Sequence, residues 1–384
     1  MWPRFLSIDR VLVLLPLVPS NHDMPSDRKR PREPAGVDDD DEQEKLEFVV
    51  AGCGAGDTAV YNGAASSCFL LRRRRGAGAG NAPLLVVDLG FGARRAIAAL
   101  CGGPFPADAP IYISHNHSDH AAELPVVVAV ESKRRRSCDP PLVVLAEEGV
   151  AERLRTHRLH ELRSTGARLD ALVDVRGMAA GEGARHGDSP VHPLPPLNAD
   201  LAARLFPPWQ LGLTLVRSKH AERCYGFVLS CRRRGCPRPG SAGPREGGEE
   251  AGWTPLLGFS GDSALDPDLY RALARAPLVV VDARPLDAWA RPSTEHAVVD
   301  HVVEAALYPG SCLSRARRVV IYGYGGARER RAAARDLARG RKRAARAEAA
   351  PLDESGREEW SSFSPPTVEI ATPGLVLPVP WPGT

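Results

Sequence analysis

Six residues near position 115 constrain the fold of this chain more than any other segment. The run His115-Asn116-His117-Ser118-Asp119-His120 follows directly on residues 111–114, whose apolar character predicts a short buried strand. Because alternate side chains of an extended segment point the same way, the first two histidines can face one point. The aspartate and the last histidine come one turn later and can face a second point. Imidazole nitrogens and carboxylates are suitable zinc ligands, so the run predicts a metal site.

Two metal ions side by side can activate water and stabilise a developing oxyanion. The alternative interpretation is a polar loop whose histidines only form hydrogen bonds. A complete metal site needs ligands from elsewhere, and two residues are candidates. His220 follows a predicted strand at 211–216, where it is otherwise an ordinary turn histidine. Asp262 ends the turn Ser260-Gly261-Asp262, where its carboxylate can bridge two metals or cap a following helix.

The pattern of apolar segments predicts an α/β protein. With 384 residues, the chain is long enough for one large domain or two small ones. Four short predicted strands between 46 and 114 favour an early β-sheet, and strands then alternate with helices through 142–324. We therefore expect a single domain over 46–384, preceded by a disordered or targeting tail at 1–45. That tail contains a basic patch at 28–32 that resembles a nuclear-localisation signal.

Three segments after residue 230 interrupt this plan. Residues 232–252 are rich in arginine, glycine, proline and glutamate, and they predict a solvent loop between two strands. Residues 332–365 predict a charged, low-complexity insert, the first part of which has helical composition. Residues 366–379 predict a closing hairpin around Pro373-Gly374.

Charge and cysteine content bear on the partners and the compartment. The formal net charge is +3, from 50 basic and 47 acidic residues, which argues neither for nor against a nucleic-acid partner. Eight cysteines without a CxxC pair predict reduced thiols in an intracellular protein. We expect a cytoplasmic or nuclear location, with organellar targeting left open. No segment is long and apolar enough to predict a membrane span, so no membrane partner is expected.

The order of the motifs along the chain resembles the metallo-β-lactamase superfamily. The matching pieces are Gly52-Cys53-Gly54-Ala55-Gly56, Asp88-Leu89-Gly90, the run at 115–120, the segment 220–227 and Ser260-Gly261-Asp262. Within the superfamily, the chain is most similar to the branch of ribonuclease Z, the tRNA 3′-processing endonuclease, and its phosphodiesterase relatives. The resemblance covers about residues 46–330 and implies an αββα sandwich with the site on one edge.

The resemblance also implies a role for each matching residue. His115, His117 and His220 would hold one zinc ion, Asp119 and His120 would hold a second, and Asp262 would bridge them. Asp119 would also orient the attacking hydroxide. The family has a further histidine that precedes a helix and acts as a general acid. His296 matches it by its distance from Glu304-Ala305-Ala306, and His301 is the fallback.

One family ligand has no counterpart in this chain. The family's last metal histidine directly follows a buried strand, and here the predicted strand 319–322 is followed by Gly323. The second zinc would then keep only Asp119, His120 and the bridge, and should bind more weakly. Tyr322 and Tyr324 are adjacent, but phenolate is an uncommon zinc ligand. Substituting histidine for Gly323 is expected to raise activity if the missing ligand limits it.

These observations predict a zinc-dependent hydrolase of phosphodiester bonds. Its substrate would be RNA, such as a tRNA precursor, or a small phosphodiester, and a homodimer is left open. The absent ligand at Gly323 motivates one alternative, a weakened or non-catalytic zinc-binding member that binds RNA or protein. Hydrolysis of a small ester, thioester or lactone is a second alternative, because it needs the same metal site and a different pocket.

Overall fold

The computed structural model describes residues 45–74, 81–134, 139–163, 169–180, 190–195, 209–220, 223–233, 252–286, 294–350 and 360–381. The chain divides into two units, Met1–Asp41 and Glu42–Thr384, and every described residue belongs to the second. The tail expected at 1–45, with its basic patch, therefore lies outside the described residues apart from Lys45.

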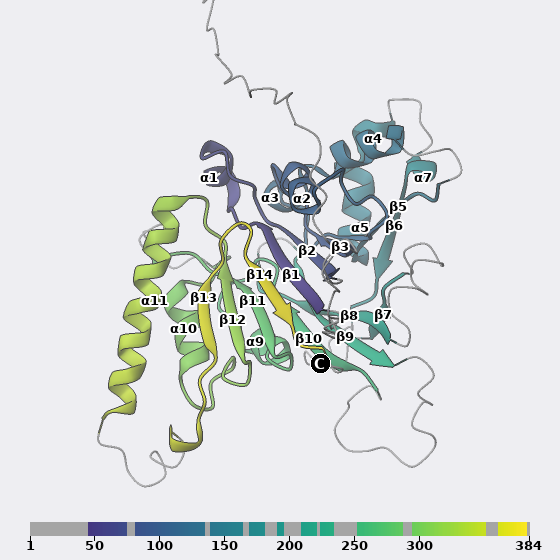
Figure 1. Ribbon diagram of the computed structural model, residues 1–384. Helices are drawn as coiled ribbons and strands as arrows, with labels where there is room; N and C mark the ends of the chain where they lie inside the picture. Colours follow the sequence, from purple (N-terminus) through teal and green to yellow (C-terminus); the bar gives the residue numbers. More distant parts are fainter. Residues whose placement is uncertain are drawn as a thin grey trace, which may run out of the picture. The chain divides into compact units, whose positions relative to one another are not determined.

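The described strands form two sheets of seven strands each (Figure 1). The first sheet has, in spatial order, β14 (Val376–Val379), β1 (Lys45–Gly52), β2 (Cys68–Arg74), β3 (Asn81–Val87), β4 (Ile111–Tyr112), β5 (Leu142–Glu147) and β6 (Val173–Met178). The second has β13 (Thr367–Ile370), β12 (Arg318–Tyr322), β11 (Leu278–Asp282), β10 (Thr254–Phe259), β9 (Tyr225–Arg233), β8 (Trp209–Arg217) and β7 (Val191–Pro193).

The two sheets repeat one pairing plan. Strands β1, β2 and β3 pair antiparallel, and β3 to β6 then pair parallel. In the second sheet, β7 to β10 pair antiparallel and β10 to β13 pair parallel. Several strands are buried along their whole length, as β11 is, because one face meets the other sheet and the opposite face meets helices. The strand-then-helix plan expected for the second half of the chain is confirmed.

Aromatic side chains join the two sheets at the centre of the core. Phe69 of β2 packs edge-on against Phe259 of β10, with ring centroids 5.2 Å apart, and against Tyr322 of β12 at 5.1 Å. Phe259 and Tyr322 stack on each other at 5.6 Å. All three rings are fully buried. Aromatic rings of this size contribute much of the apolar area that a core removes from water.

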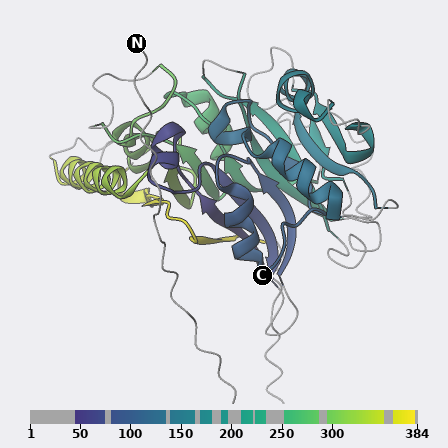
Figure 2. The same ribbon diagram turned by 90° about the horizontal axis from the view of Figure 1, so that it is seen from above.

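Helices cover the outer face of each sheet (Figure 2), which confirms the expected αββα sandwich. The first sheet carries α2 (Ala93–Cys101), α5 (Glu148–Arg153) and α7 (Leu169–Leu172), and the second carries α9 (Pro267–Leu273), α10 (Val299–Leu307) and α11 (Ala327–Glu348). The remaining described helices are α1 (Gly56–Tyr61), α3 (Ser118–Ala121), α4 (Leu124–Arg134), the π-helix η1 (Leu154–Arg158) and α6 (His160–Arg163). No helix in the described ranges has the length and apolar content needed to cross a membrane.

The prediction of a closing hairpin at 366–379 is wrong. Strand β13 pairs parallel with β12, whereas β14 pairs antiparallel with β1 in the other sheet. The turn at Gly374, where φ is 86°, passes the chain from one sheet to the other. Its amide donates to the carbonyl of Val50 over 2.7 Å. The local turn signal was sound, but the two sheet edges that accept the flanking strands are set by tertiary packing.

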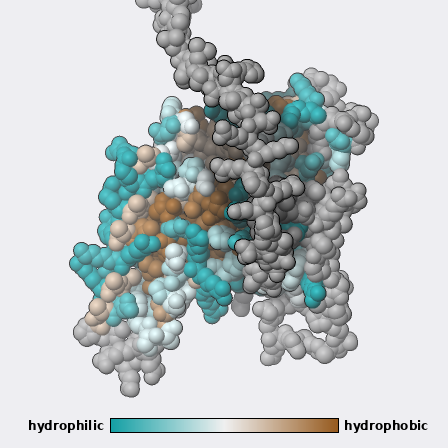
Figure 3. All heavy atoms as spheres, viewed as in Figure 1, coloured by the Kyte–Doolittle hydropathy of each residue, from teal (hydrophilic) through white to brown (hydrophobic). Residues whose placement is uncertain are grey.

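The charged segment expected as an insert at 332–365 contributes most of helix α11 to the outer layer. Ala333, Leu337 and Gly340 are buried on its inner face against α10. The exposed face is rich in arginine, and Figure 3 shows a largely hydrophilic surface on that side. Of the loop expected at 232–252, Arg232 and Arg233 end strand β9, and residues 234–251 lie outside the described residues.

Replacing Phe259 with alanine is expected to lower the free energy of unfolding by about 3–5 kcal/mol, because the cavity would lie between the sheets. Guanidinium denaturation followed by circular dichroism measures this change. Val126→Ala is the control: this side chain on α4 is 49% exposed, so the change should stay within about 0.5 kcal/mol. Equal losses in the two variants would contradict the packing described for the core.

Candidate metal centre

The candidate site lies where several strands end at one edge of the sandwich. His115 follows β4 in the first sheet. His220 and Asp262 follow β8 and β10 in the second sheet, and Asp282 is the last residue of β11. Strands β8, β10 and β11 run in the same direction, so their carboxyl ends meet at the same edge. Residues that are far apart in the sequence are thereby brought together.

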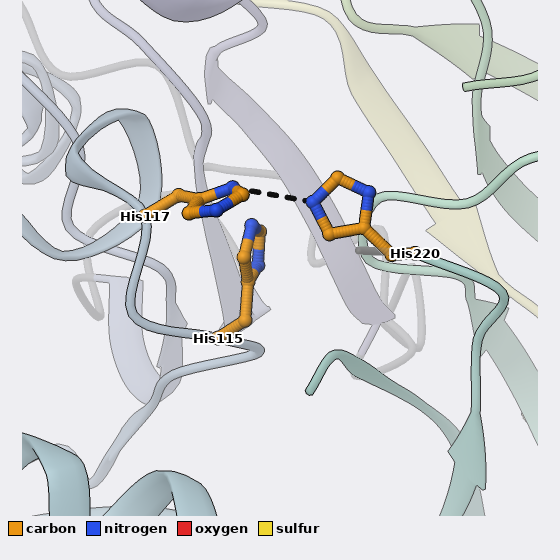
Figure 4. Close-up of side chains that lie close together, drawn as sticks. All are labelled: His115, His117 and His220. Atoms are coloured by element: carbon orange, nitrogen blue, oxygen red, sulfur yellow. Dashed lines mark hydrogen bonds between the residues drawn. The ribbon is translucent and has the colours of Figure 1, made fainter. Parts of the chain in front are cut away.

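Three histidines converge at this edge (Figure 4). The rings of His115 and His117 lie 4.6 Å apart, and each lies 5.0 Å from the ring of His220. Nε2 of His220 is 3.2 Å from Nδ1 of His117. One nitrogen from each ring falls in a set whose members all lie within 4.8 Å of one another. Three imidazoles so arranged can hold one metal ion.

A close backbone contact positions the second half of the histidine cluster. Helix α3 begins directly after His117, and the carbonyl of His120 accepts a hydrogen bond from the amide of Leu89 over 2.6 Å. A Cβ atom on Gly90 would come within 2.0 Å of the carbonyl oxygen of Asp119. Only glycine therefore allows the Asp-Leu-Gly segment to pack against α3.

Asp88 orients the ring of His120 from its Nδ1 side. Its carboxylate accepts hydrogen bonds from the amide and the hydroxyl of Ser114, and lies 2.7 Å from Nδ1 of His120. Burial raises the pKa of Asp88, and this outweighs the opposing effect of His120. An Nδ1–H bonded to this carboxylate leaves Nε2 facing the site, which is how many metal-binding histidines are oriented.

Asp119 and Asp262 bring carboxylates to the same place. Asp119 accepts a hydrogen bond from the amide of Gly56 over 2.8 Å, so the glycine-rich loop after β1 orients this side chain. Asp262 is buried, and its Oδ1 lies 3.1 Å from Nε2 of His120. Asp262 is not a helix cap, since Asp266 caps α9 by accepting from the amides of residues 268 and 269.

The buried ligand atoms fit a metal ion. Among the described residues, Nε2 of His115 is buried without a hydrogen-bond partner, and the buried Nε2 of His120 and Oδ1 of Asp262 have only each other, 3.1 Å apart. Leaving such atoms unsatisfied is unfavourable, and a cation that binds all three would satisfy them. Burial also lowers the pKa of His115 well below 6.5, which favours the neutral imidazole that a metal requires.

His296 joins the cluster from the segment before α10. Its Nδ1 donates to Oδ2 of Asp282 over 2.7 Å, and its ring lies 5.3 Å from the ring of His220. Burial lowers the pKa of His296, but the carboxylate of Asp282 outweighs it, so the net shift is upward. His220, Asp262 and His296 form a further candidate ligand group. His301, the fallback, is in α10 and in none of the groups found among the described residues.

Position 323 has no room for a metal-binding side chain. Gly323 adopts a φ of 106°, and a Cβ atom there would lie 2.2 Å from Oδ1 of Asp282. Substituting histidine would strain the backbone and meet the carboxylate of Asp282, so the structure does not favour the expected gain of activity. Tyr322 is buried among the core rings, and the hydroxyl of Tyr324 donates to the carbonyls of Ile321 and Ala371. The hydroxyl of Tyr324 is therefore bonded elsewhere, whereas the hydroxyl of Tyr322 is buried without a hydrogen-bond partner among the described residues.

The site predicted from the sequence lacks two residues that the structure places there, Asp282 and Arg284. Arg284 is only 5% exposed, and its Nη1 donates to the carbonyl oxygen of Gly323. Its Nη2 lies 3.8 Å from Oδ2 of Asp262, and its Nε lies 3.8 Å from Oδ1 of Asp282. An available signal was the pair of charged residues at the end of the wholly apolar segment 278–281.

Several solved structures are similar to this chain. Unliganded yeast PDE1 is 13% identical and has a TM-score of 0.54, over 87% of this chain and 99% of that one. Human tRNase Z, short form, is 15% identical with a TM-score of 0.47, over 87% and 100%. The metallo-β-lactamase fold protein YhfI from Bacillus subtilis is 14% identical with a TM-score of 0.47, over 86% and 99%. No family model and no curated protein matches the sequence.

The chain has the metallo-β-lactamase fold. The two mixed seven-stranded sheets, the helices on both outer faces and the histidine cluster at one edge agree with it, as does the likeness to yeast PDE1. At 13% identity, the likeness to PDE1 shows the fold alone. The chemistry must therefore be argued from the residues of this site.

Replacing His220 with alanine is expected to weaken metal binding by more than about tenfold, since changes to residues outside the ligand set can already cost that much. Elemental analysis after dialysis against a series of buffered metal concentrations measures the affinity. His157→Ala is the matched control, because His157 is an exposed histidine of η1 and should leave the affinity unchanged. Retention of wild-type affinity in His220→Ala would contradict the three-histidine site.

Proposed function

We propose that this protein is a zinc-dependent hydrolase of phosphodiester bonds. The observation that carries the proposal is the placement of the hydrogen-bonded pair His296–Asp282 beside the three-histidine cluster, with His296 and His220 rings 5.3 Å apart. A metal site and an acid on one edge of the fold are the two groups that cleavage of a stable ester needs.

His115, His117 and His220 would hold the zinc ion, with the carboxylate of Asp262 beside them. Neutral imidazole nitrogens and a carboxylate oxygen are a suitable donor set for zinc. Bound there, zinc supplies Lewis-acid polarisation of a phosphoryl oxygen and a lowered pKa for water. The chain also fixes the side chains around that ion, because Asp88 holds His120 and the glycine-rich loop holds Asp119.

Two side chains would handle the protons of the reaction. Asp119, held by the amide of Gly56, orients the attacking water and accepts its hydrogen bond. His296 donates a proton to the leaving oxygen, and Asp282 keeps the imidazole oriented and favours its protonated form. A general acid matters most when the leaving group is a poor one, such as the alkoxide of a ribose or another alcohol.

This dependence on the leaving group favours phosphodiesters over activated small esters. Alkyl phosphodiesters lose a strongly basic oxygen, so a histidine kept protonated by a carboxylate helps their cleavage. The buried guanidinium of Arg284 adds a positive charge beside Asp262, which suits an anionic substrate. The substrate class therefore includes RNA, such as a tRNA precursor, and small phosphodiesters.

Replacing His296 with alanine is expected to lower kcat by about 10²–10⁴-fold on a phosphodiester with an alkoxide leaving group. Bis(p-nitrophenyl) phosphate should lose much less, because p-nitrophenolate departs without needing a proton. Steady-state kinetics on both substrates, for the wild type and for His296→Ala, measure the difference. His157→Ala serves again as the control and should leave both rates unchanged.

Two results would contradict the proposal. Equal losses on the two substrates would show that His296 acts as a metal ligand or a structural residue and not as an acid. Hydrolysis of carboxylic esters or lactones by the zinc-loaded wild type, with no turnover of pre-tRNA or of any small phosphodiester, would assign the protein to the other hydrolase class. A substrate panel that includes pre-tRNA, with chelation and zinc add-back, provides that comparison.

A further inference from the structure

We propose that the guanidinium of Arg284 takes the place of a second metal ion, so that the centre holds one metal and one fixed organic cation. This inference depends on the three-histidine metal site of the proposed function, but not on the identity of the substrate. It is carried by the surroundings of Gly323, by the burial of Arg284 and by the carboxylates that face it.

The ligand set for a second metal is incomplete in this site. Asp119, His120 and Asp262 remain on one side, with Nε2 of His120 3.8 Å from Asp119 and 3.1 Å from Asp262. On the other side, a Cβ atom at Gly323 would overlap Oδ1 of Asp282 at 2.2 Å. The backbone carbonyl of Gly323 accepts a hydrogen bond from Nη1 of Arg284. The position that lacks a ligand side chain thus binds the guanidinium instead.

Arg284 brings a permanent charge to that position. Its side chain is only 6% exposed, and its nitrogen atoms lie 3.8 Å from Asp262 and 3.8 Å from Asp282. Burial alone would lower the pKa of Arg284, but Asp282, Asp262 and Asp119 outweigh it and raise that pKa. A guanidinium stays protonated in proteins, so the charge does not depend on the pH.

The fixed cation accounts for the carboxylates gathered at the site. Buried carboxylates require a nearby positive charge, and two metal ions would provide it in a dinuclear centre. Here Arg284 faces Asp262 and Asp282, and a divalent ion placed beside it would be repelled. With so little exposed surface, Arg284 acts on a bound phosphate through its charge and not through a direct contact.

Metal stoichiometry tests the inference without reference to activity. The full-length wild type, saturated with Zn²⁺ and freed of excess, is expected to hold one zinc per chain by elemental analysis and by native mass spectrometry. Titration of the metal-free protein with Co²⁺ should saturate its visible absorption at one equivalent. Two metal ions of comparable affinity in the wild type would overturn the proposal, whatever the variants do.

Substitutions of Arg284 test the cause. Arg284→Met removes the charge at similar length and is expected to bind a second metal at least about tenfold more tightly than the wild type does, at millimolar Zn²⁺. Arg284→Lys keeps a positive charge and should still hold one zinc per chain. Arg318→Met, which removes an arginine of β12 that pairs with Glu369 of β13, is the matched control and should also hold one zinc per chain.

Two further outcomes separate this inference from the proposed function. If Arg284→Met binds no second metal, or Arg284→Lys binds one as readily as Arg284→Met does, charge at this position is not what excludes the ion and the proposal fails. If Arg284→Met does not fold, the number of zinc ions per chain in the wild type and in Arg284→Lys decides whether the proposal stands. A protein with one zinc and no phosphodiesterase activity would overturn the proposed function and leave this inference standing.

Discussion

The packing of the two sheets face to face is the constraint on which the site depends. The contact of Phe69 with Phe259 and Tyr322 sets the distance between the sheets, and with it the distance between the strand ends. His115 leaves one sheet, whereas His220 and Asp262 leave the other. Their donor atoms can converge within a few ångströms only because the core beneath them is rigidly packed. The positions of the site residues therefore depend on the packing of the core.

The sequence predicts well those features that depend on local order. The strand before His115, the turn before Asp262 and the αββα class follow from periodicity, turn chemistry and a resemblance based on short motifs. The closing hairpin failed because Gly374 marks a turn without saying which sheet edge receives each flanking strand. The sequence predicts an insert where helix α11 lies, because the exposed arginines of this helix mask the narrow buried stripe that packs on α10.

The same distinction between local sequence and tertiary packing applies to the site residues. The spacing in the histidine cluster indicates metal ligands by itself, whereas Asp282 and Arg284 acquire meaning only from their three-dimensional neighbours. Asp282 holds Nδ1 of His296 from fourteen positions away, and Arg284 reaches the carbonyl of Gly323 across 39 positions. An arginine two residues after a buried strand is usually a surface residue, so composition gives no warning of its burial.

The absence of a ligand side chain at Gly323 is accounted for by the position of Arg284. Read alone, the glycine indicates a damaged metal site, which favoured a weakened or non-catalytic protein. Oδ1 of Asp282 lies where a side chain at 323 would begin, and the carbonyl of Gly323 binds Arg284. A lost ligand would leave buried carboxylates without a counter-charge, which is strongly unfavourable. Here Arg284 supplies a counter-charge from the chain itself, so Gly323 is consistent with the one-metal centre proposed above, in which Asp282 also holds His296.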